Sequence, residues 1–252
     1  MDSDARKQVI LDLLGAKGSV TNTELGERFR VSEMTIRRDL TQLEADGLLR
    51  RTHGGAVRGP SSSFEPPFAM RARLNVEAKR AIAASVAGLV KDGQTLVLDG
   101  GTTGQAVAEA LVGRNITVCA LNLRVAEILS SSPATKVMVP GGFIRHHELS
   151  FTGPAAEQTL RDHRFDTYVM TVSGLSSTAG LTEWTVEDAA VKRAALASSA
   201  SCIVACDSSK FGQTAFALIA PISAVDVVVT DADLSTDHRR SLGATGTDLR
   251  LA

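Results

Sequence analysis

Apolar side chains in the first part of the chain recur three or four positions apart, which lines them along one face of a helix. The residues in this pattern are Val9, Ile10, Leu13, Leu14, Leu25, Phe29, Ile36, Leu40 and Leu43. Gly18 interrupts the first stretch. Thr21 and Glu24 have the spacing of a capping box before the second stretch, and Ser32 can cap the third. The pattern predicts three short helices, the last of which ends near Gly47.

Residues 58–68, with the sequence RGPSSSFEPPF, follow neither a helical nor a strand pattern. Proline and serine dominate this segment, which is the composition of an extended connector. Apolar periodicity is present on both sides of it. We therefore predict two domains, residues 1–57 and 69–252, joined by a linker at residues 58–68.

After the linker, short apolar runs that suit buried strands alternate with helical segments. The runs are Leu96–Leu98, Ile116–Leu121, Lys136–Val139, Tyr168–Val172, Cys202–Cys206 and Val225–Thr230. Helical spacing occurs over Glu77–Val90 and Glu187–Ser199. This alternation predicts an α/β domain whose mainly parallel sheet is covered by helices on both faces.

The composition is that of a folded protein. Of the 252 residues, 44% are apolar and 22% are charged, so the chain can bury a core. No stretch reaches about 18 uninterrupted apolar residues, and the start of the chain lacks the apolar segment of a signal peptide. We therefore expect a cytoplasmic protein with no membrane partner. Cys119, Cys202 and Cys206 each lie in an apolar stretch and are expected to be buried, reduced thiols.

The run His146-His147-Glu148 is a dense set of metal-binding side chains. Adjacent residues point in different directions, however, and no second pair of ligands stands at the spacing of a tetrahedral site. We expect a solvated loop here, and we expect neither a metal ion nor a cofactor.

The net charge of -1 gives no sign of a nucleic-acid partner, so any such sign must come from local placement. With Ile36, Leu40 and Leu43 facing inward, the opposite face of the third predicted helix is polar or basic. That face carries Met34, Thr35, Arg37, Arg38 and Thr41. In the major groove, arginine can pair with guanine and threonine can contact a thymine methyl group.

The segment LLRRTHGGAV, residues 48–57, predicts two short strands with Gly54-Gly55 near their turn. Arg50, Arg51 and His53 would then lie on a wing beside a DNA duplex, and Lys7 could contact a phosphate. A charged helix face alone is more often a solvated surface. The capping box, apolar register, paired arginines and wing occur together within 58 residues, and this combination favours a helix-turn-helix. The candidate DNA-binding residues are Ser32, Met34, Thr35, Arg37, Arg38, Thr41, Arg50, Arg51 and His53.

Three polar loops follow predicted strands of the larger domain, at the edge where ligands bind in open α/β sheets. The first, Asp99–Thr103, precedes a helix, so its backbone N–H groups and hydroxyls can bind an anion such as phosphate. The second is Gly141-Gly142, and the third, Asp207–Gly212, contains the point charge of Lys210. Each loop alone can be an ordinary turn. Together with the acid Asp188 they predict a pocket.

Several segments in both predicted domains resemble those of a known protein family. In the first domain they are Glu24-Leu25, Phe29 to Leu40, Leu43 to Arg51 and His53–Ala56. In the second they are Glu77, Lys79, LDGGTT at 98–103, Asn122, Gly141-Gly142, Gly153, Ser173–Leu175, Gly180–Thr182, Lys192, DSSKFG at 207–212 and Thr230-Asp231. This set resembles the DeoR/GlpR family of bacterial transcription regulators over almost the whole chain.

The resemblance implies an N-terminal winged helix-turn-helix and a sensor domain similar in fold to ribose-5-phosphate isomerase and coenzyme A transferases. Thr35, Arg37 and Arg38 become the recognition-helix candidates. It also implies a homo-oligomer, dimer or tetramer, that represses sugar or carbohydrate genes and leaves its double-stranded DNA operator when a phosphorylated sugar binds. The implied effector-binding residues are Asp99, Gly101, Thr102, Thr103, Asn122, Gly142, Gly174, Asp188 and Lys210.

The chain departs from the family pattern at two positions. Leu121 stands where the family usually has threonine before the asparagine, and Asp188 stands where glutamate is usual, four residues before Lys192. Ser176 keeps the polar residue that is common after the Ser-Gly turn. Because the shorter acid moves a carboxylate by one carbon–carbon bond, the identity of the effector cannot be copied from relatives.

Two other functions fit some of these residues. In a sugar-phosphate isomerase, Asp99 or Asp207 would take a proton while Lys210 stabilised an enediolate. Such an enzyme has no use for the 57-residue N-terminal module, so we expect the chain not to be an enzyme. In a DNA-binding protein without a ligand, the larger domain would serve only to form the oligomer, and its polar loops would be structural turns.

Overall fold

The boundary between two compact units lies at Leu74/Asn75 in the computed structural model, which describes residues 3–45, 48–58 and 65–252. Residues 59–64, the middle of the predicted linker, lie outside the described residues, as does Gly47. Residues 69–74 cluster with the first unit. They do so because Met70, in the short helix α4 (Phe68–Arg71), packs against the core of that unit.

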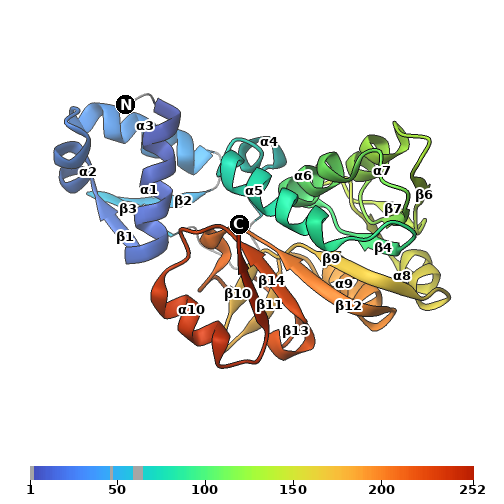
Figure 1. Cartoon of the computed structure of the whole chain (residues 1–252). Helices are drawn as coiled ribbons and strands as arrows, with labels where there is room; N and C mark the ends of the chain where they lie inside the picture. Colours follow the sequence, from blue (N-terminus) through green and yellow to red (C-terminus); the bar gives the residue numbers. More distant parts are fainter. Residues whose placement is uncertain (1–2, 46–47, 59–64) are drawn as a thin grey trace. The chain divides into compact units, whose positions relative to one another are not determined.

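The first unit joins helices to a small antiparallel sheet. Besides α4, its helices are α1 (Ser3–Lys17), α2 (Asn22–Phe29) and α3 (Glu33–Ala45). The strands are β1 (Ser19–Thr21), β2 (Leu49–Thr52) and β3 (Gly55–Arg58), in the order β1-β3-β2 (Figure 1). The predicted helices are confirmed, because their apolar stripe is the core. Its buried members include Ile10, Leu14, Leu25, Ile36, Leu40 and Leu43.

The helix boundaries follow the predicted signals. Thr21 caps α2, since its hydroxyl accepts a hydrogen bond of 3.1 Å from the backbone N–H of Glu24. Gly18 ends α1 with a φ of 77°, a left-handed conformation that favours glycine. Ser32 accepts a hydrogen bond of 3.2 Å from the N–H of Thr35 and so caps α3. The direction in which α3 leaves its turn is therefore fixed locally.

The second unit is built on a parallel sheet in the order β15-β14-β12-β9-β4-β5-β6. Its strands are β4 (Thr95–Leu98), β5 (Thr117–Ala120), β6 (Lys136–Met138), β9 (Phe165–Met170), β12 (Ser199–Ala205), β14 (Val227–Thr230) and β15 (Asp248–Leu251). Every neighbouring pair is parallel, as the alternation predicted. The short edge strand β15, in which charged and apolar residues alternate, was not predicted.

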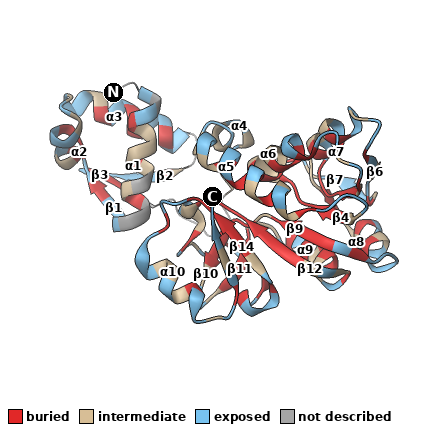
Figure 2. Cartoon of the chain, viewed as in Figure 1, coloured by how far each residue is buried: buried red, intermediate tan, exposed pale blue. Residues whose placement is uncertain are grey.

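Helices cover both faces of this sheet. The helices are α5 (Val76–Leu89), α6 (Gly101–Leu111), α7 (Leu123–Ser130), α8 (Pro154–Arg161), α9 (Val186–Ala197) and α10 (Thr236–Gly243). Leu96 and Leu98 pack against α5, α6 and α7, whereas Val97 between them belongs to the cluster that contains α8 and α9 (Figure 1). The central strands of the sheet are largely buried (Figure 2), whereas the edge strands β6 and β15 are not. The predicted α/β fold is confirmed.

Smaller elements that the sequence did not predict complete the unit. An antiparallel sheet has the order β10-β11-β13, with strands at Gly174–Ser176, Gly180–Glu183 and Ala217–Ala220. A hairpin pairs β7 (Phe143–Ile144) with β8 (Phe151–Thr152), and 3-10 turns occupy Ser208–Lys210 and Ile222–Ala224. The cysteines are free and buried, as predicted, and burial raises the pKa of Cys119 to about 12.

Candidate functional site

The outward face of α3 is the exposed basic surface that the helical pattern predicted. Ile36, Leu40 and Leu43 are buried, while Met34 on the other side is 73% exposed. The remaining candidates on this face are Arg37, Arg38 and Thr41, all exposed, and the half-buried Thr35. Among the described residues, Arg38 has no ion-pair or hydrogen-bond partner, so its guanidinium is available to a ligand.

Arg37 differs from its neighbour because Glu33 lies 3.6 Å from its guanidinium, one turn away on the same helix. Both side chains are about half exposed, so the pair is well solvated and adds little stability. An incoming phosphate can therefore displace Glu33 without a large penalty.

The wing is a tight hairpin of β2 and β3 that docks on α3. Thr52 pairs with Gly55, which leaves His53 and Gly54 as the exposed loop. The Arg51 guanidinium donates to Thr41 at 2.8 Å, and the Arg51 N–H donates to Glu44 at 2.8 Å. The wing and the recognition face are therefore connected by hydrogen bonds, which partly occupy two of the DNA-binding candidates.

Gly55 is required where β3 pairs with β1. A Cβ atom at this position would lie 2.0 Å from the carbonyl oxygen of Val20, which is backbone and cannot move aside. The glycine of the HGGA segment thus permits the contact between the wing and the rest of the unit.

A buried ion pair that sequence reasoning missed holds α3 on α1. The Arg6 guanidinium lies 2.6 Å from the carboxylate of Asp39, and both side chains are less than a tenth exposed. Ser3 donates to the second oxygen of Asp39 at 3.1 Å. The signal was present, because Asp39 falls on the inward side of the helix, where an acid needs a partner.

In the second unit, Asp99 follows β4 and is 5% exposed. One carboxylate oxygen accepts from the N–H of Gly100 at 2.8 Å. The other accepts from the hydroxyl of Tyr168 at 3.2 Å and the N–H of Thr171 at 3.1 Å, and it lies 2.9 Å from the ammonium of Lys192. Asp99 is therefore engaged with the protein itself, and it shapes the loop instead of offering free oxygens.

Lys192 joins Asp99 to a second buried acid, Glu183, whose carboxylate lies 2.5 Å from the same ammonium. Burial alone would lower the pKa of Lys192, but the two carboxylates hold it well above its ordinary value. Burial alone would raise the pKa of Glu183, yet Lys192 and the donors of Ser173 and Trp184 hold it below its ordinary value. Lys192 and Glu183 therefore stabilise each other's charged forms inside the protein. Sequence reasoning noted Lys192 but missed Glu183.

The loop after Asp99 is packed closely against Asn122. A Cβ atom at Gly100 would lie 2.7 Å from the side-chain nitrogen of Asn122. That side chain caps α7 through the N–H of Arg124 at 2.9 Å and donates to the carbonyl of Glu148 at 2.8 Å. Asn122 thus joins two loops at the carboxyl edge of the sheet.

Helix α6 begins in the DGGTT loop and points its first N–H groups out of the helix. Its N-cap is Gly100, which has no side chain that could accept a hydrogen bond from these N–H groups. Gly101 has a φ of 72°. Thr102 is half-buried and Thr103 is buried. Backbone N–H groups and threonine hydroxyls thus lie at the carboxyl end of β4, where the sequence predicts an anion-binding loop.

The remaining candidates are held by internal contacts. Asp188 lies 2.8 Å from the Arg145 guanidinium and accepts from Ser150 at 2.7 Å, although burial raises its pKa above the ordinary value. A Cβ atom at Gly142 would lie 2.3 Å from the carbonyl of Thr152, and one at Gly174 would lie 2.5 Å from that of Gln213. Those glycines serve close packing.

Lys210 differs from all of these. Its ammonium lies 5.3 Å from the centre of the Trp184 ring, and within the described part of the chain no carboxylate is within ion-pair distance of it. Trp184 follows Glu183, so a chain of contacts connects Lys210 with Lys192 and Asp99. The candidates therefore divide into residues held by internal contacts and residues that can offer donors to a ligand.

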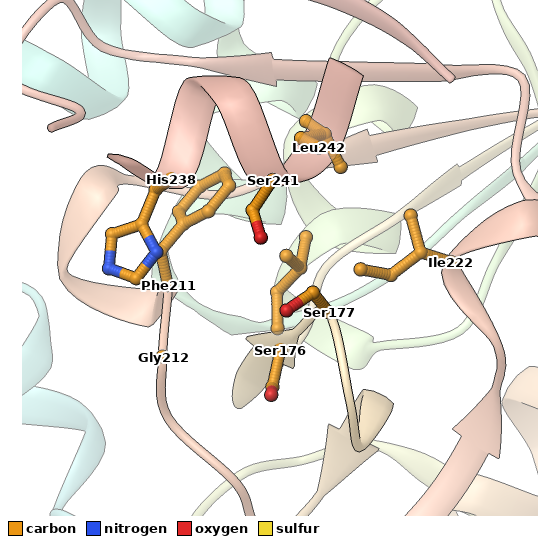
Figure 3. A pocket seen from close by; sticks show the side chains of 9 residues that line it. Ser176, Ser177, Phe211, Gly212, Ile222, His238, Ser241 and Leu242 are labelled. Atoms are coloured by element: carbon orange, nitrogen blue, oxygen red, sulfur yellow. The ribbon is translucent and has the colours of Figure 1, made fainter. Parts of the chain in front are cut away.

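A separate small pocket lies beside α10 (Figure 3). Its lining residues are Leu175, Ser176, Ser177, Phe211, Gly212, Ile222, His238, Ser241 and Leu242. Its volume is about 50 Å³, against roughly 300–1,000 Å³ for a small-molecule site. The ring centres of His238 and Phe211, which both line it, are 5.8 Å apart. The pocket is too small for a sugar phosphate, and its lining contains none of the predicted effector residues.

Over residues 3–45, 48–58 and 65–252, His, Cys, Asp and Glu side chains form no group of three that could hold a metal ion. The His146 and His147 rings are exposed and stand 5.8 Å apart. None of the described helices has the length and hydrophobicity needed to span a bilayer.

Known families match both units. Residues 6–61 match the DeoR-like helix-turn-helix domain, and residues 74–232 match the DeoR C terminal sensor domain. The glycerol-3-phosphate regulon repressor of Escherichia coli is 36% identical over 250 residues, covering 96% of this chain and 99% of the relative. The transcriptional repressor AccR of Agrobacterium fabrum is 37% identical over 92% of this chain and 90% of its own length.

A solved structure of ribose 5-phosphate isomerase A from Methanocaldococcus jannaschii is similar over 55% of this chain and 56% of its own, with a TM-score of 0.42 and 14% identity. The structure of the full-length sorbitol operon regulator SorC from Klebsiella pneumoniae aligns over 100% of this chain and 96% of its own chain. Its TM-score is 0.38 and its sequence identity is 11%. Superpositions this loose do not support a shared activity.

Proposed function

Because this chain belongs to the DeoR family of transcriptional regulators, we propose that it represses genes of sugar or carbohydrate metabolism and leaves its operator when it binds a phosphorylated sugar. The observation that carries the proposal is the outward face of α3. There, Arg38 is exposed and unpaired among the described residues, directly opposite a buried apolar stripe. A helix with these two faces suits insertion into the major groove.

The DNA contacts divide into two kinds. Thr35, Arg37 and Arg38 are placed to read base edges, while Arg50 and His53 on the wing are placed to contact phosphates or the neighbouring groove. Thr41 and Arg51 are proposed to contribute through the hydrogen bond that holds the wing against the helix. Ser32 contributes through its cap.

The effector site is proposed at the carboxyl edge of the parallel sheet. The first turn of α6, with Gly101 and Thr102, supplies backbone and hydroxyl donors, and Lys210 supplies a positive charge. Asp99, Thr103, Asn122, Gly142, Gly174 and Asp188 are proposed to build the walls. The name of the relative suggests a sugar or polyol phosphate, since it is a repressor of a glycerol-3-phosphate regulon.

Catalysis is disfavoured by the state of the two candidate bases. The oxygens of Asp99 are engaged by Lys192, Tyr168 and backbone N–H groups. Although burial opposes ionisation of Asp207, Lys210 and the Ser209 hydroxyl hold the pKa of that carboxyl below its ordinary value. An acid with a lowered pKa is a weak base. We therefore propose a sensor and not an isomerase.

Release from DNA is proposed to work through a homo-oligomer in the cytoplasm. An effector can shift the protein between two states only by binding one of them more tightly. We propose that the ligated sensor domains favour an oligomer in which paired helix-turn-helix units no longer match both half-sites.

Replacing Arg38 with alanine is expected to weaken binding to DNA from upstream of the protein's own gene by about 5- to 150-fold at a fixed salt concentration. The loss follows from the bidentate contact that arginine makes with a guanine. Titration of labelled DNA, followed by fluorescence anisotropy, measures the change.

The control for this variant is Arg80→Ala, which removes the same charge from an exposed position on α5 that pairs only with Glu77 in the described structure. It should bind as the native chain does. If Arg38→Ala bound DNA with native affinity, α3 would not be the helix that recognises the bases. An equal loss of affinity for unrelated DNA would show that Arg38 contacts a phosphate and does not read a base.

A further inference from the structure

Trp184 is the single tryptophan of the chain, and the structure fixes its backbone. Its N–H donates to the Glu183 carboxylate at 2.9 Å. That carboxylate is held in turn by Lys192 at 2.5 Å and by the hydroxyl of Ser173. The backbone of Trp184 at the end of β11 is therefore held by a buried ionic cluster. Its side chain is half-buried.

The turn that carries Lys210 is also fixed. Asp207 accepts from the N–H of Ser209 at 3.2 Å, and Asp231 accepts from the N–H of Ser208 at 2.7 Å. Asp207 is itself buried and accepts from the Asn75 side chain at 2.9 Å. The turn thus presents Lys210 from a rigid base, and its ammonium reaches to 5.3 Å from the indole centre.

This geometry leaves donors on the ammonium. One side of the Lys210 ammonium lies against the π face of the indole. The ring attracts the cation but does not accept a hydrogen bond from every N–H group. No protein oxygen in the described ranges takes a hydrogen bond from Lys210, and no carboxylate is within ion-pair distance. Lys192, in contrast, is saturated by Asp99, Glu183 and the carbonyl of Thr171. Of these two lysines, only Lys210 is equipped to receive an anion.

We propose that Trp184 is a positioning residue of the effector site, which holds the Lys210 ammonium over its ring so that the free donors meet the phosphate monoester of the effector. This inference rests on the proposed function, and nothing in the family motifs assigns the residue. A pre-positioned ammonium binds more tightly because less side-chain freedom is lost on binding. The indole also shields the charge from water on one side.

The test is calorimetric titration of the full-length protein with glycerol 3-phosphate, fructose 6-phosphate and ribose 5-phosphate. Trp184→Leu is expected to weaken the binding of the tightest of these esters about fivefold, and Trp184→Phe is expected to stay within about twofold because an aromatic face remains. Lys210→Met should lose about tenfold or more, since it removes a charged donor. Phe216→Leu, at an exposed aromatic residue of the loop before β13, is the matched control and should bind as the native chain.

Intrinsic fluorescence supplies a readout that a purely structural role would not move. With a single tryptophan, any ligand-induced change in emission comes from Trp184. The native chain should show a change that saturates with the calorimetric affinity, and Lys210→Met should lose that ligand-induced change.

Native affinity in Trp184→Leu would overturn this inference and leave the proposed function standing. Native affinity in Lys210→Met would overturn it as well, because the ammonium would then not contact the ligand. If the native chain bound none of the three esters, the proposed effector class would fail, and this inference would fail with it.

Discussion

Replacing Lys192 with methionine is expected to lower the free energy of unfolding of the second unit by about 3–5 kcal/mol. The ammonium compensates Asp99 and Glu183, and all three side chains are 8% exposed. Methionine keeps most of the length of the side chain and removes the charge, so two buried carboxylates would repel each other without a cation. Urea unfolding followed by Trp184 emission reports on this unit, because the single tryptophan lies in it.

Lys91→Met is the matched control, because Lys91 is exposed and the charge change is the same. It should change the free energy by no more than about 0.5 kcal/mol. Adding Glu183→Gln to Lys192→Met should recover part of the loss, since it removes one of the uncompensated charges. A Lys192→Met protein that unfolds at the native urea concentration would contradict the cluster described above.

Asp39→Asn is expected to destabilise the first unit by a similar amount, about 3–5 kcal/mol, and to weaken DNA binding because the folded population falls. The change preserves the shape of the side chain but removes the carboxylate charge that lies 2.6 Å from the buried Arg6 guanidinium. Since small domains have only about 5–15 kcal/mol of stability, the expected loss is a large share. Hydrogen exchange of amides in α1 and α3 measures it.

For this variant the comparison is Glu33→Gln, which breaks the solvated pair with Arg37 on the same helix. Its amides should exchange as in the native chain. Unchanged protection of α1 and α3 in Asp39→Asn would show that the buried pair does not hold the recognition helix in place.

The elements with strong periodic patterns could be predicted from the sequence, and those without could not. Ile36, Leu40 and Leu43 repeat at helical spacing and indeed line the core of the first unit. The main parallel strands are apolar runs buried on both faces, which few other structures explain. β10, β11 and β15 are short and rich in glycine, threonine or charge, so their pairing depends on distant partners.

The candidate site shows the same limit. Loop composition at the strand ends indicated where polar groups would gather. Contacts connect Asp99 with Lys210 through Lys192, Glu183 and Trp184, and the loop after Asp99 packs against Asn122. Composition did not show which charges compensate one another, because Asp99 and Lys192 are far apart in the sequence. Trp184 belongs to none of the sequence motifs, and its contact with Lys210 depends on the fold.

The central claim is tested most directly by binding of the native chain to its own upstream DNA, at one stated salt concentration, with and without sugar phosphates and the same sugars without phosphate. The account predicts specific binding that one phosphate ester weakens and its unphosphorylated counterpart does not. Affinity no greater than for unrelated DNA, or an operator complex that none of these esters alters, would contradict it.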